Sequence, residues 1–204
     1  MTHEATAVTA RFSEAAEYAR AAHAGQVRKR TRIPYISHPI AVASLVLTYG
    51  GDEDQAIAAL LHDVLEDCGA HHEETIRARF GDRVARMVLD CTDGTAETKA
   101  GADTPEAKRR DWERRKVAYL DALQHKQGDT LLVSACDKLH NARCIVDDLD
   151  DPATGLAVFD RFKAGREGTA WYYGELARVF AERGSPVAPA LAGVVRRIAT
   201  AGAA

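Results

Sequence analysis

Residues 58–67, Ala-Ala-Leu-Leu-His-Asp-Val-Leu-Glu-Asp, constrain the fold more than any other stretch, because an apolar segment ends there in four ionisable side chains. Apolar residues from Ala56 to Leu65 cover most sides of a helix that we expect to begin near Asp52, which predicts a buried position. Buried carboxylates rarely stay charged unless they are paired or bind a metal. The stretch therefore indicates a functional group at the end of a core helix; the plainer alternative is a helix end with solvated acids.

The order of the four side chains indicates a metal-binding pair followed by an acid–base pair. His62 and Asp63 are adjacent, so both can reach one cation. Glu66 and Asp67 follow them at the spacing of one helical turn. We therefore expect His62 and Asp63 to be ligands and Glu66 and Asp67 to be catalytic.

Further metal-ligand candidates lie in two separate segments. His38 follows a Pro-Tyr-Ile-Ser turn, and Asp137 comes directly after an apolar run that begins at Leu131. A single histidine or aspartate in an apolar segment is more often a hydrogen-bonded structural residue, so spacing alone leaves both interpretations open. A set of two imidazoles and two carboxylates suits Mn²⁺, Fe²⁺ or Zn²⁺ with open positions for water and substrate. The candidate ligand set is His38, His62, Asp63 and Asp137.

Helical periodicity runs through almost the whole chain, and no alternating pattern of convincing length predicts a strand. The fold class is therefore all-α. A chain of 204 residues is expected to form a single domain over 1–204, with a core of about 10–180 and a C-terminal helical extension of about 185–204. The segment 93–104 is small and polar and predicts a loop. The expected helices cover residues 8–24, 38–49, 52–67, 73–80, 82–92, 105–126 and 130–149, with others around 171–180 and 187–199.

Charge and composition exclude several classes of protein. The net charge of −3 makes a broad basic face for nucleic acid improbable. No apolar stretch approaches the length of a membrane span, and the first residues do not resemble a signal peptide. The four cysteines lack zinc-finger spacing and are typical of free thiols in a reducing compartment. A cytoplasmic protein that is a monomer or a homodimer, without nucleic acid or membrane as partner, is expected.

Four motifs in sequence resemble the HD-domain superfamily, and more closely the hydrolase domain of RelA/SpoT proteins and the stand-alone small alarmone hydrolases. The motifs are Arg28-Lys29 with Pro34-Tyr35-Ile36-Ser37-His38-Pro39, then Leu60-Leu61-His62-Asp63-Val64-Leu65-Glu66-Asp67, then Phe80-Gly81-Asp82-Arg83-Val84, and then Asp137-Lys138-Leu139-His140-Asn141. The resemblance implies a single HD-type helical bundle of about eight to ten helices. It also implies a metal, usually Mn²⁺, held by the four candidate ligands.

The same resemblance implies hydrolysis of guanosine 3′,5′-bis(diphosphate) and its pentaphosphate relative, with release of pyrophosphate from the 3′ position. The catalytic pair of the family maps onto Glu66 and Asp67. The implied substrate contacts are Arg28 and Lys29 for the nucleotide and its phosphates, Asn141 for the ribose, and Tyr172 for the far side of the nucleotide. The plainer alternatives are a solvated loop charge for Arg28, a helix-surface contact for Asn141 and a core aromatic for Tyr172.

One departure from the long alarmone enzymes leaves other substrates open. Ser134 stands where a lysine is familiar, and we hypothesise that Arg115 or Lys116 supplies that charge near the phosphates. Otherwise the cluster of basic residues from 109 to 116 is a solvated helix face. The alternatives are an HD phosphohydrolase acting on another nucleotide or NADPH, and a non-catalytic metal- and nucleotide-binding module. Metal binding alone needs neither Glu66 nor Asp67, which argues against the module.

Overall fold

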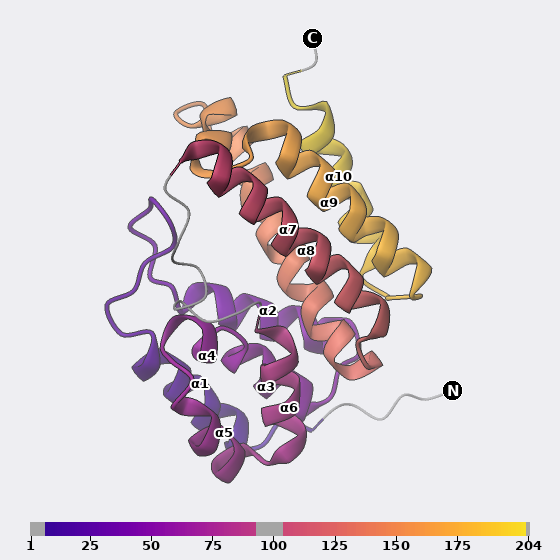
Figure 1. The fold of residues 1–204 in the computed structure, drawn as a ribbon. Coiled ribbons are helices and arrows are strands. Elements are labelled where there is room, and N and C mark those ends of the chain that lie inside the picture. The colour runs from indigo at the N-terminus through magenta and orange to yellow at the C-terminus, as the bar shows by residue number, and fades with distance from the viewer. Residues whose placement is uncertain (1–6, 93–103, 203–204) are drawn as a thin grey trace. The chain divides into compact units, whose positions relative to one another are not determined.

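A computed structural model of the protein describes residues 7–92 and 104–202 (Figure 1). The predicted loop at 93–104 lies, except for Thr104, outside these residues. In the described part the chain is helical, and its one extended pairing is an isolated antiparallel bridge between Val27 and Pro34. The all-α prediction is therefore confirmed. The helices are α1 (Ala10–Ala22), α2 (Ser37–Thr48), α3 (Glu53–Leu61), α4 (Val64–Asp67), α5 (His72–Phe80), α6 (Asp82–Cys91), α7 (Pro105–His125), α8 (Gly128–Asp150), the 3-10 helix η2 (Gly155–Arg161), α9 (Gly165–Glu182) and α10 (Ala188–Thr200).

The chain divides into two compact units. The first unit comprises residues 1–100 and 127–136, and so holds α1 to α6 with the beginning of α8. The second unit comprises residues 101–126 and 137–204, and holds α7, the rest of α8, η2, α9 and α10. The predicted C-terminal extension contains α10, which packs against α9. The description of the whole chain as a single domain remains a prediction.

Helix α3 forms the centre of the first unit, where it packs against α1, α2 and α6. Every residue from Gln55 to Leu61 is buried, as the apolar pattern predicts. A capping box begins the helix: the Asp52 carboxylate accepts from the backbone N–H of Gln55, and the Gln55 side chain accepts from the N–H of Asp52. The helix that carries the candidate site is therefore fixed at its start by hydrogen bonds and along its length by packing.

The structure corrects one detail of this region. The expected continuous helix from Asp52 to Asp67 is interrupted at His62 and Asp63, between α3 and α4. Asp63 has φ −96° and ψ −4°, which departs from ideal helical values, although the N–H of Asp67 still donates to its carbonyl at 2.9 Å. His62 and Asp63 therefore lie at a turn, where both side chains can point to the same place.

The second unit is built around α9, which packs against α7, η2 and α10. Among the large side chains of α9, Tyr172, Leu176 and Phe180 are buried. Trp171 is the exception: it is 40% exposed and contacts the ring of Trp112 on α7 edge-on at 6.1 Å between centroids. The Trp171 side chain points to a different side of α9 from that of the buried residues, so it is only partly covered by other side chains.

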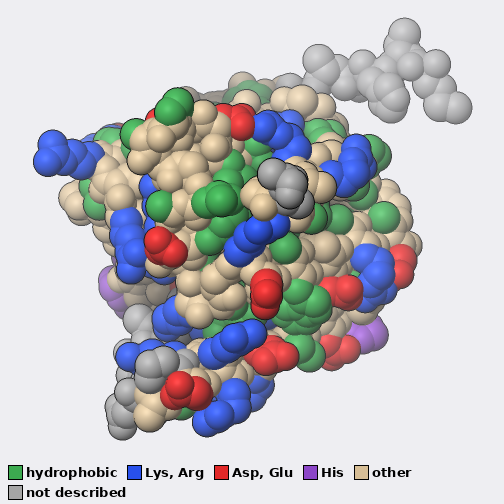
Figure 2. Space-filling view, turned by 90° about the horizontal axis from the view of Figure 1, so that it is seen from above, with side chains coloured by type: hydrophobic (Ala, Val, Ile, Leu, Met, Phe, Trp, Pro, Cys, Tyr) green, Lys and Arg blue, Asp and Glu red, His purple; other side chains and the backbone are tan. Residues whose placement is uncertain are grey.

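The surface shown in Figure 2 carries Lys and Arg side chains interspersed with Asp and Glu. This mixture on one face agrees with the small net charge. Among the described residues, no helix is long and apolar enough to cross a membrane. All four cysteines are free thiols. The cytoplasmic location remains a prediction.

A pH-dependent contribution to stability is expected at His72, at the start of α5. Burial, followed by the neighbouring His71 and His23, lowers the pKa of His72 below its ordinary value of 6.5. Because the unfolded chain then takes up this proton at a higher pH than the folded chain does, the free energy of unfolding should fall as pH drops below about 6.5. Denaturant unfolding from pH 7 to 5 should show a smaller loss in His72→Gln. Equal losses in both proteins would contradict this.

Candidate metal centre

Two buried imidazoles form the base of the candidate site. His38 lies in the first turn of α2 and is 2% exposed, and His62 follows α3 and is 3% exposed. Their ring centroids are 5.2 Å apart. His62 Nδ1 lies 2.8 Å from the carbonyl oxygen of Ala59, so Nδ1 carries the proton and donates, and Nε2 keeps a lone pair. This tautomer is the one that a metal ligand needs.

Asp63 directs one oxygen at both imidazoles. Its Oδ2 lies 3.1 Å from His62 Nε2 and 3.5 Å from His38 Nε2. The Tyr35 hydroxyl donates to the same oxygen at 2.6 Å. The turn between α3 and α4 makes this arrangement possible, because it brings the side chain of Asp63 beside that of His62. Three of the four predicted ligands thus converge within the first unit.

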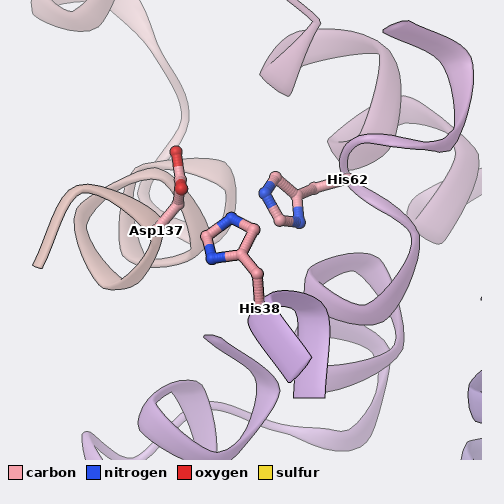
Figure 3. A group of neighbouring side chains, drawn as sticks. All are labelled: His38, His62 and Asp137. Atoms are coloured by element: carbon pink, nitrogen blue, oxygen red, sulfur yellow. The ribbon is translucent and has the colours of Figure 1, made fainter. Parts of the chain in front are cut away.

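Asp137 is the fourth predicted ligand. It directly follows Cys136, the last residue of the first unit, within the unbroken helix α8, and is 7% exposed. Ligand atoms of His38, His62 and Asp137 lie within 4.8 Å of one another (Figure 3). The three side chains come from segments that are far apart in the sequence. The three side chains form a group that could hold a metal ion, and their role as ligands remains a prediction.

The carboxylate of Asp137 is held by two neighbours on α8. Asn141 Nδ2 donates to Oδ1 at 2.6 Å, and Lys138 Nζ lies 2.8 Å from Oδ2. A carboxylate buried to this extent would be costly without such bonds. The bonds also fix the orientation of the Asp137 carboxylate, and such supporting hydrogen bonds orient a ligand for metal binding.

The donor set fits a divalent transition metal. Two neutral imidazole nitrogens with carboxylate oxygens suit Mn²⁺, Fe²⁺ or Zn²⁺. Asp63 Oδ2 lies 3.1 Å from His62 Nε2, and ligand atoms of His38, His62 and Asp137 all lie within 4.8 Å of one another. Small adjustments of these side chains would bring them around one ion at metal–ligand distances of about 2 Å.

The family model for the HD domain matches residues 15–170. The chain belongs to the HD-domain family. The guanosine-3′,5′-bis(diphosphate) 3′-pyrophosphohydrolase MESH1 of Homo sapiens is 34% identical over 137 residues, which is 66% of this chain and 69% of the human protein. The enzyme of the same name from Aquifex aeolicus is 47% identical over 81 residues, 40% of this chain. The present chain spans only 11% of the length of that relative.

A solved structure shows the same fold. It is that of a metazoan orthologue of SpoT that hydrolyses ppGpp. It superposes with a TM-score of 0.74 and 25% sequence identity, covering 95% of this chain and 98% of that one. The predicted resemblance to the alarmone hydrolases is therefore confirmed at the level of family and fold.

The remaining predicted site residues differ in their exposure. Glu66 is half-buried and Asp67 exposed, both on α4. Arg28 is half-buried and Lys29 exposed, in the loop closed by the bridge of Val27 to Pro34. Tyr172 is 6% exposed and stacks edge-on with Trp112 at 6.2 Å. Their roles in catalysis and substrate binding remain predictions.

Sequence reasoning missed the residues that support the ligands. Tyr35 stands three positions before His38 in the first of the four motifs, but the motif does not predict its bond to Asp63. The ring of His23, at the end of α1, lies 4.8 Å from that of Tyr35, and Gln26 Oε1 lies 2.8 Å from His23 Nδ1. The sequence contained one usable indication, because a tyrosine hydroxyl just before a buried histidine is well placed to reach a neighbouring ligand. Only the folded chain shows that this ligand is Asp63.

Removing the Tyr35 hydroxyl should weaken metal binding. In Tyr35→Phe the ring still packs against His23, but Asp63 Oδ2 loses the donor that orients it. Supporting hydrogen bonds of this kind typically change metal affinity by about 10- to 100-fold. Titration of Mn²⁺ monitored by the EPR signal of the free ion measures the change. The control Tyr49→Phe alters a half-buried tyrosine at the end of α2 and should leave the affinity as it is. An unchanged affinity in Tyr35→Phe would contradict the assigned role.

Proposed function

We propose that this chain is a Mn²⁺-dependent hydrolase that removes pyrophosphate from the 3′ position of guanosine 3′,5′-bis(diphosphate) and its pentaphosphate relative. The observation that carries the proposal is the convergence of His38, His62 and Asp137 within 4.8 Å, with Asp63 Oδ2 against both imidazoles. Relatives with this named activity, including one of which the chain covers 69%, support the choice of substrate.

The metal, when bound, would polarise a phosphoryl oxygen and lower the pKa of a bound water. His38, His62, Asp63 and Asp137 would hold it, with His62 presented in the correct tautomer by the carbonyl of Ala59. Mn²⁺ is the proposed ion because the resemblance to the alarmone hydrolases implies it, and the mixed nitrogen and oxygen donor set is compatible with it. Fe²⁺ and Zn²⁺ are the alternatives, and a titration with each ion decides among them.

The protein's own residues would supply proton transfer and positioning. Water attacks the phosphorus bonded to the ribose 3′ oxygen, the bond between that phosphorus and the 3′ oxygen breaks, and the 3′ oxygen takes up a proton. Glu66, half-buried on the turn of helix that follows the ligand pair, would orient or deprotonate the water, or protonate the departing oxygen, and Asp67 would assist it. The products are the guanosine 5′-diphosphate and pyrophosphate.

The loop from Gln26 to Tyr35 would contact the nucleotide. It is closed by the bridge of Val27 to Pro34 and by the N–H of Arg28 donating to the carbonyl of Ile33 at 2.9 Å. A guanidinium can stack on a base and also bond oxygens, which suits Arg28, and Lys29 adds a charge for phosphate. Asn141 would reach the ribose from its place beside Asp137, and Tyr172 would bound the far side of the nucleotide.

A substrate panel tests this proposal. Release of pyrophosphate and of phosphate is measured with Mn²⁺ from guanosine 3′,5′-bis(diphosphate), GTP and NADPH. Pyrophosphate from the first compound alone is the expected result. Phosphate released only from NADPH or GTP would keep the metal chemistry and discard the alarmone substrate, and binding of all three without turnover would point to a non-catalytic module.

A further inference from the structure

The start of α3 is hydrogen-bonded to the start of α8 inside the first unit. Gln55, a buried residue in the first turn of α3, donates through Nε2 to the carbonyl oxygen of Asp129 at 3.1 Å. Its Oε1 accepts from the backbone N–H of Asp52 at 2.9 Å. Both ends of this buried amide are therefore bonded, one to the cap of α3 and the other to α8.

Helix α6 also holds the start of α8. Asp129 Oδ2 accepts from Arg86 Nη2 at 2.7 Å and lies 3.4 Å from Arg83 Nε. Thr130 is fully buried, and its hydroxyl donates to Asp90 Oδ2 at 3.2 Å. The first residues of α8 are therefore tied to two helices of the first unit.

The turn before α3 approaches α8 closely. A Cβ atom added to Gly51 would lie 3.1 Å from Leu132 Cδ2, which is closer than side chains ordinarily pack. Leu132 lies on α8 three residues after Asp129. The glycine therefore allows α8 to lie against this turn, next to the hydrogen bond of Gln55.

Helices α3 and α8 extend from this contact to the candidate metal centre over nearly equal lengths. His62 follows Gln55 by seven residues, and Asp137 follows Asp129 by eight. A rise of 1.5 Å per residue gives distances of about 10.5 and 12 Å along the two helices. Ligand atoms of His62 and Asp137 lie within 4.8 Å of each other. The two helices therefore run in the same direction, and a shift at their starts would displace one ligand relative to the other.

We propose that Gln55 is a positioning residue for the metal centre, because its bond to Asp129 sets the register of α8 on α3 and so the spacing of His62 and Asp137. The proposal rests on the metal centre of the proposed function and not on its substrate. Metal–ligand distances in protein sites stay within about 0.2 Å of their ordinary values, so a small shift of α8 is enough to weaken binding.

The buried amide is expected to contribute more than the ion pairs of Asp129. The Arg86 side chain is 43% exposed, and ion pairs open to water stabilise a fold little. Gln55 is only 8% exposed, so water replaces its lost hydrogen bond poorly.

Gln55→Glu is the first variant for a test on the full chain. The glutamate keeps an oxygen for the cap of α3 but has no N–H for the Asp129 carbonyl. The Kd for Mn²⁺, measured from the EPR signal of the free ion, should rise about tenfold. Gln55→Met, which is neutral and of similar length, should change the Kd in the same direction and serves if the glutamate variant does not fold. Asp129→Asn keeps the backbone carbonyl and should change the Kd less than about twofold.

Arg11→Ala is the matched control for a general loss of stability. Arg11 Nη2 donates to Asp54 and to the carbonyl of Phe80, both at 2.9 Å, and neither partner lies on α8. This variant should lower the free energy of unfolding and leave the Kd for Mn²⁺ unchanged. The EPR spectrum of the bound ion, which depends on the arrangement of its ligands, should change in Gln55→Glu and not in Arg11→Ala.

Two results would overturn the role of Gln55. One is an unchanged Kd in folded Gln55→Glu and Gln55→Met, and the other is an equal rise of the Kd in Arg11→Ala. Because the Kd is measured without substrate, a protein that binds Mn²⁺ but does not cleave guanosine 3′,5′-bis(diphosphate) would overturn the proposed function alone.

Discussion

Replacing His62 by alanine is expected to abolish both Mn²⁺ binding and hydrolysis. The substitution removes a buried imidazole whose Nε2 faces Asp63 Oδ2 at 3.1 Å and whose Nδ1 is bonded to Ala59. The free energy of unfolding should also fall by about 1–3 kcal/mol without metal, because the buried partners lose a hydrogen-bonding group. Manganese at 100 times its Kd should stabilise the unaltered protein by about 2.7 kcal/mol and His62→Ala not at all.

Calorimetry with Mn²⁺ and chemical unfolding with and without the ion measure these effects. His125→Ala is the matched control, since it removes an exposed histidine at the end of α7. That variant should bind Mn²⁺ as the unaltered protein does. Retention of stoichiometric Mn²⁺ with unchanged affinity in His62→Ala would show that the ion binds elsewhere.

The second large effect is expected for Glu66→Gln: turnover should fall by about 10²–10⁴-fold while Mn²⁺ affinity changes little. The amide keeps the shape of the carboxylate but cannot accept or donate the proton, and general acid–base catalysis contributes a factor of this size. Glu66 is half-buried in α4 and follows the ligand pair by one turn, so it is placed for proton transfer and not counted among the ligands.

Parallel measurement of kcat and of the Kd for Mn²⁺ separates the two roles. Glu74→Gln, on the exposed side of α5, should change neither quantity. Unimpaired turnover in Glu66→Gln would remove this residue from the mechanism. Loss of the metal together with turnover would reassign Glu66 as a ligand.

Local sequence signals predicted most of the helices. The bounds of α5, α6 and α7 lie within a residue or two of the expected ones, because caps and glycines mark helix ends: Thr104 caps α7, and Gly81 separates α5 from α6 with a positive φ of 93°. The interruption at His62 and Asp63 was not predicted, because the apolar pattern continues through it. At this turn Asp63 contacts Tyr35 and His38, which come from another part of the chain and which the local pattern does not include.

The candidate ligands could be proposed from the sequence, but the hydrogen bonds that hold them could not. A carboxylate in an apolar helix, as at Asp137, is costly enough to indicate a role from sequence alone. The residues that hold the ligands left no comparable signal, because Tyr35, Asn141 and Lys138 are common polar residues in ordinary positions. Asn141 illustrates the difference: a ribose contact was expected, and the structure shows its amide bonded to Asp137 at 2.6 Å.

The most direct test of the proposed hydrolysis is ³¹P NMR of guanosine 3′,5′-bis(diphosphate) incubated with the protein and Mn²⁺. The expected products are guanosine 5′-diphosphate and pyrophosphate in equal amounts, and none should form when the ion is chelated or when Glu66→Gln replaces the unaltered protein. Orthophosphate as the first product, or pyrophosphate formed equally well without Mn²⁺, would contradict a metal-dependent cleavage at the 3′ oxygen.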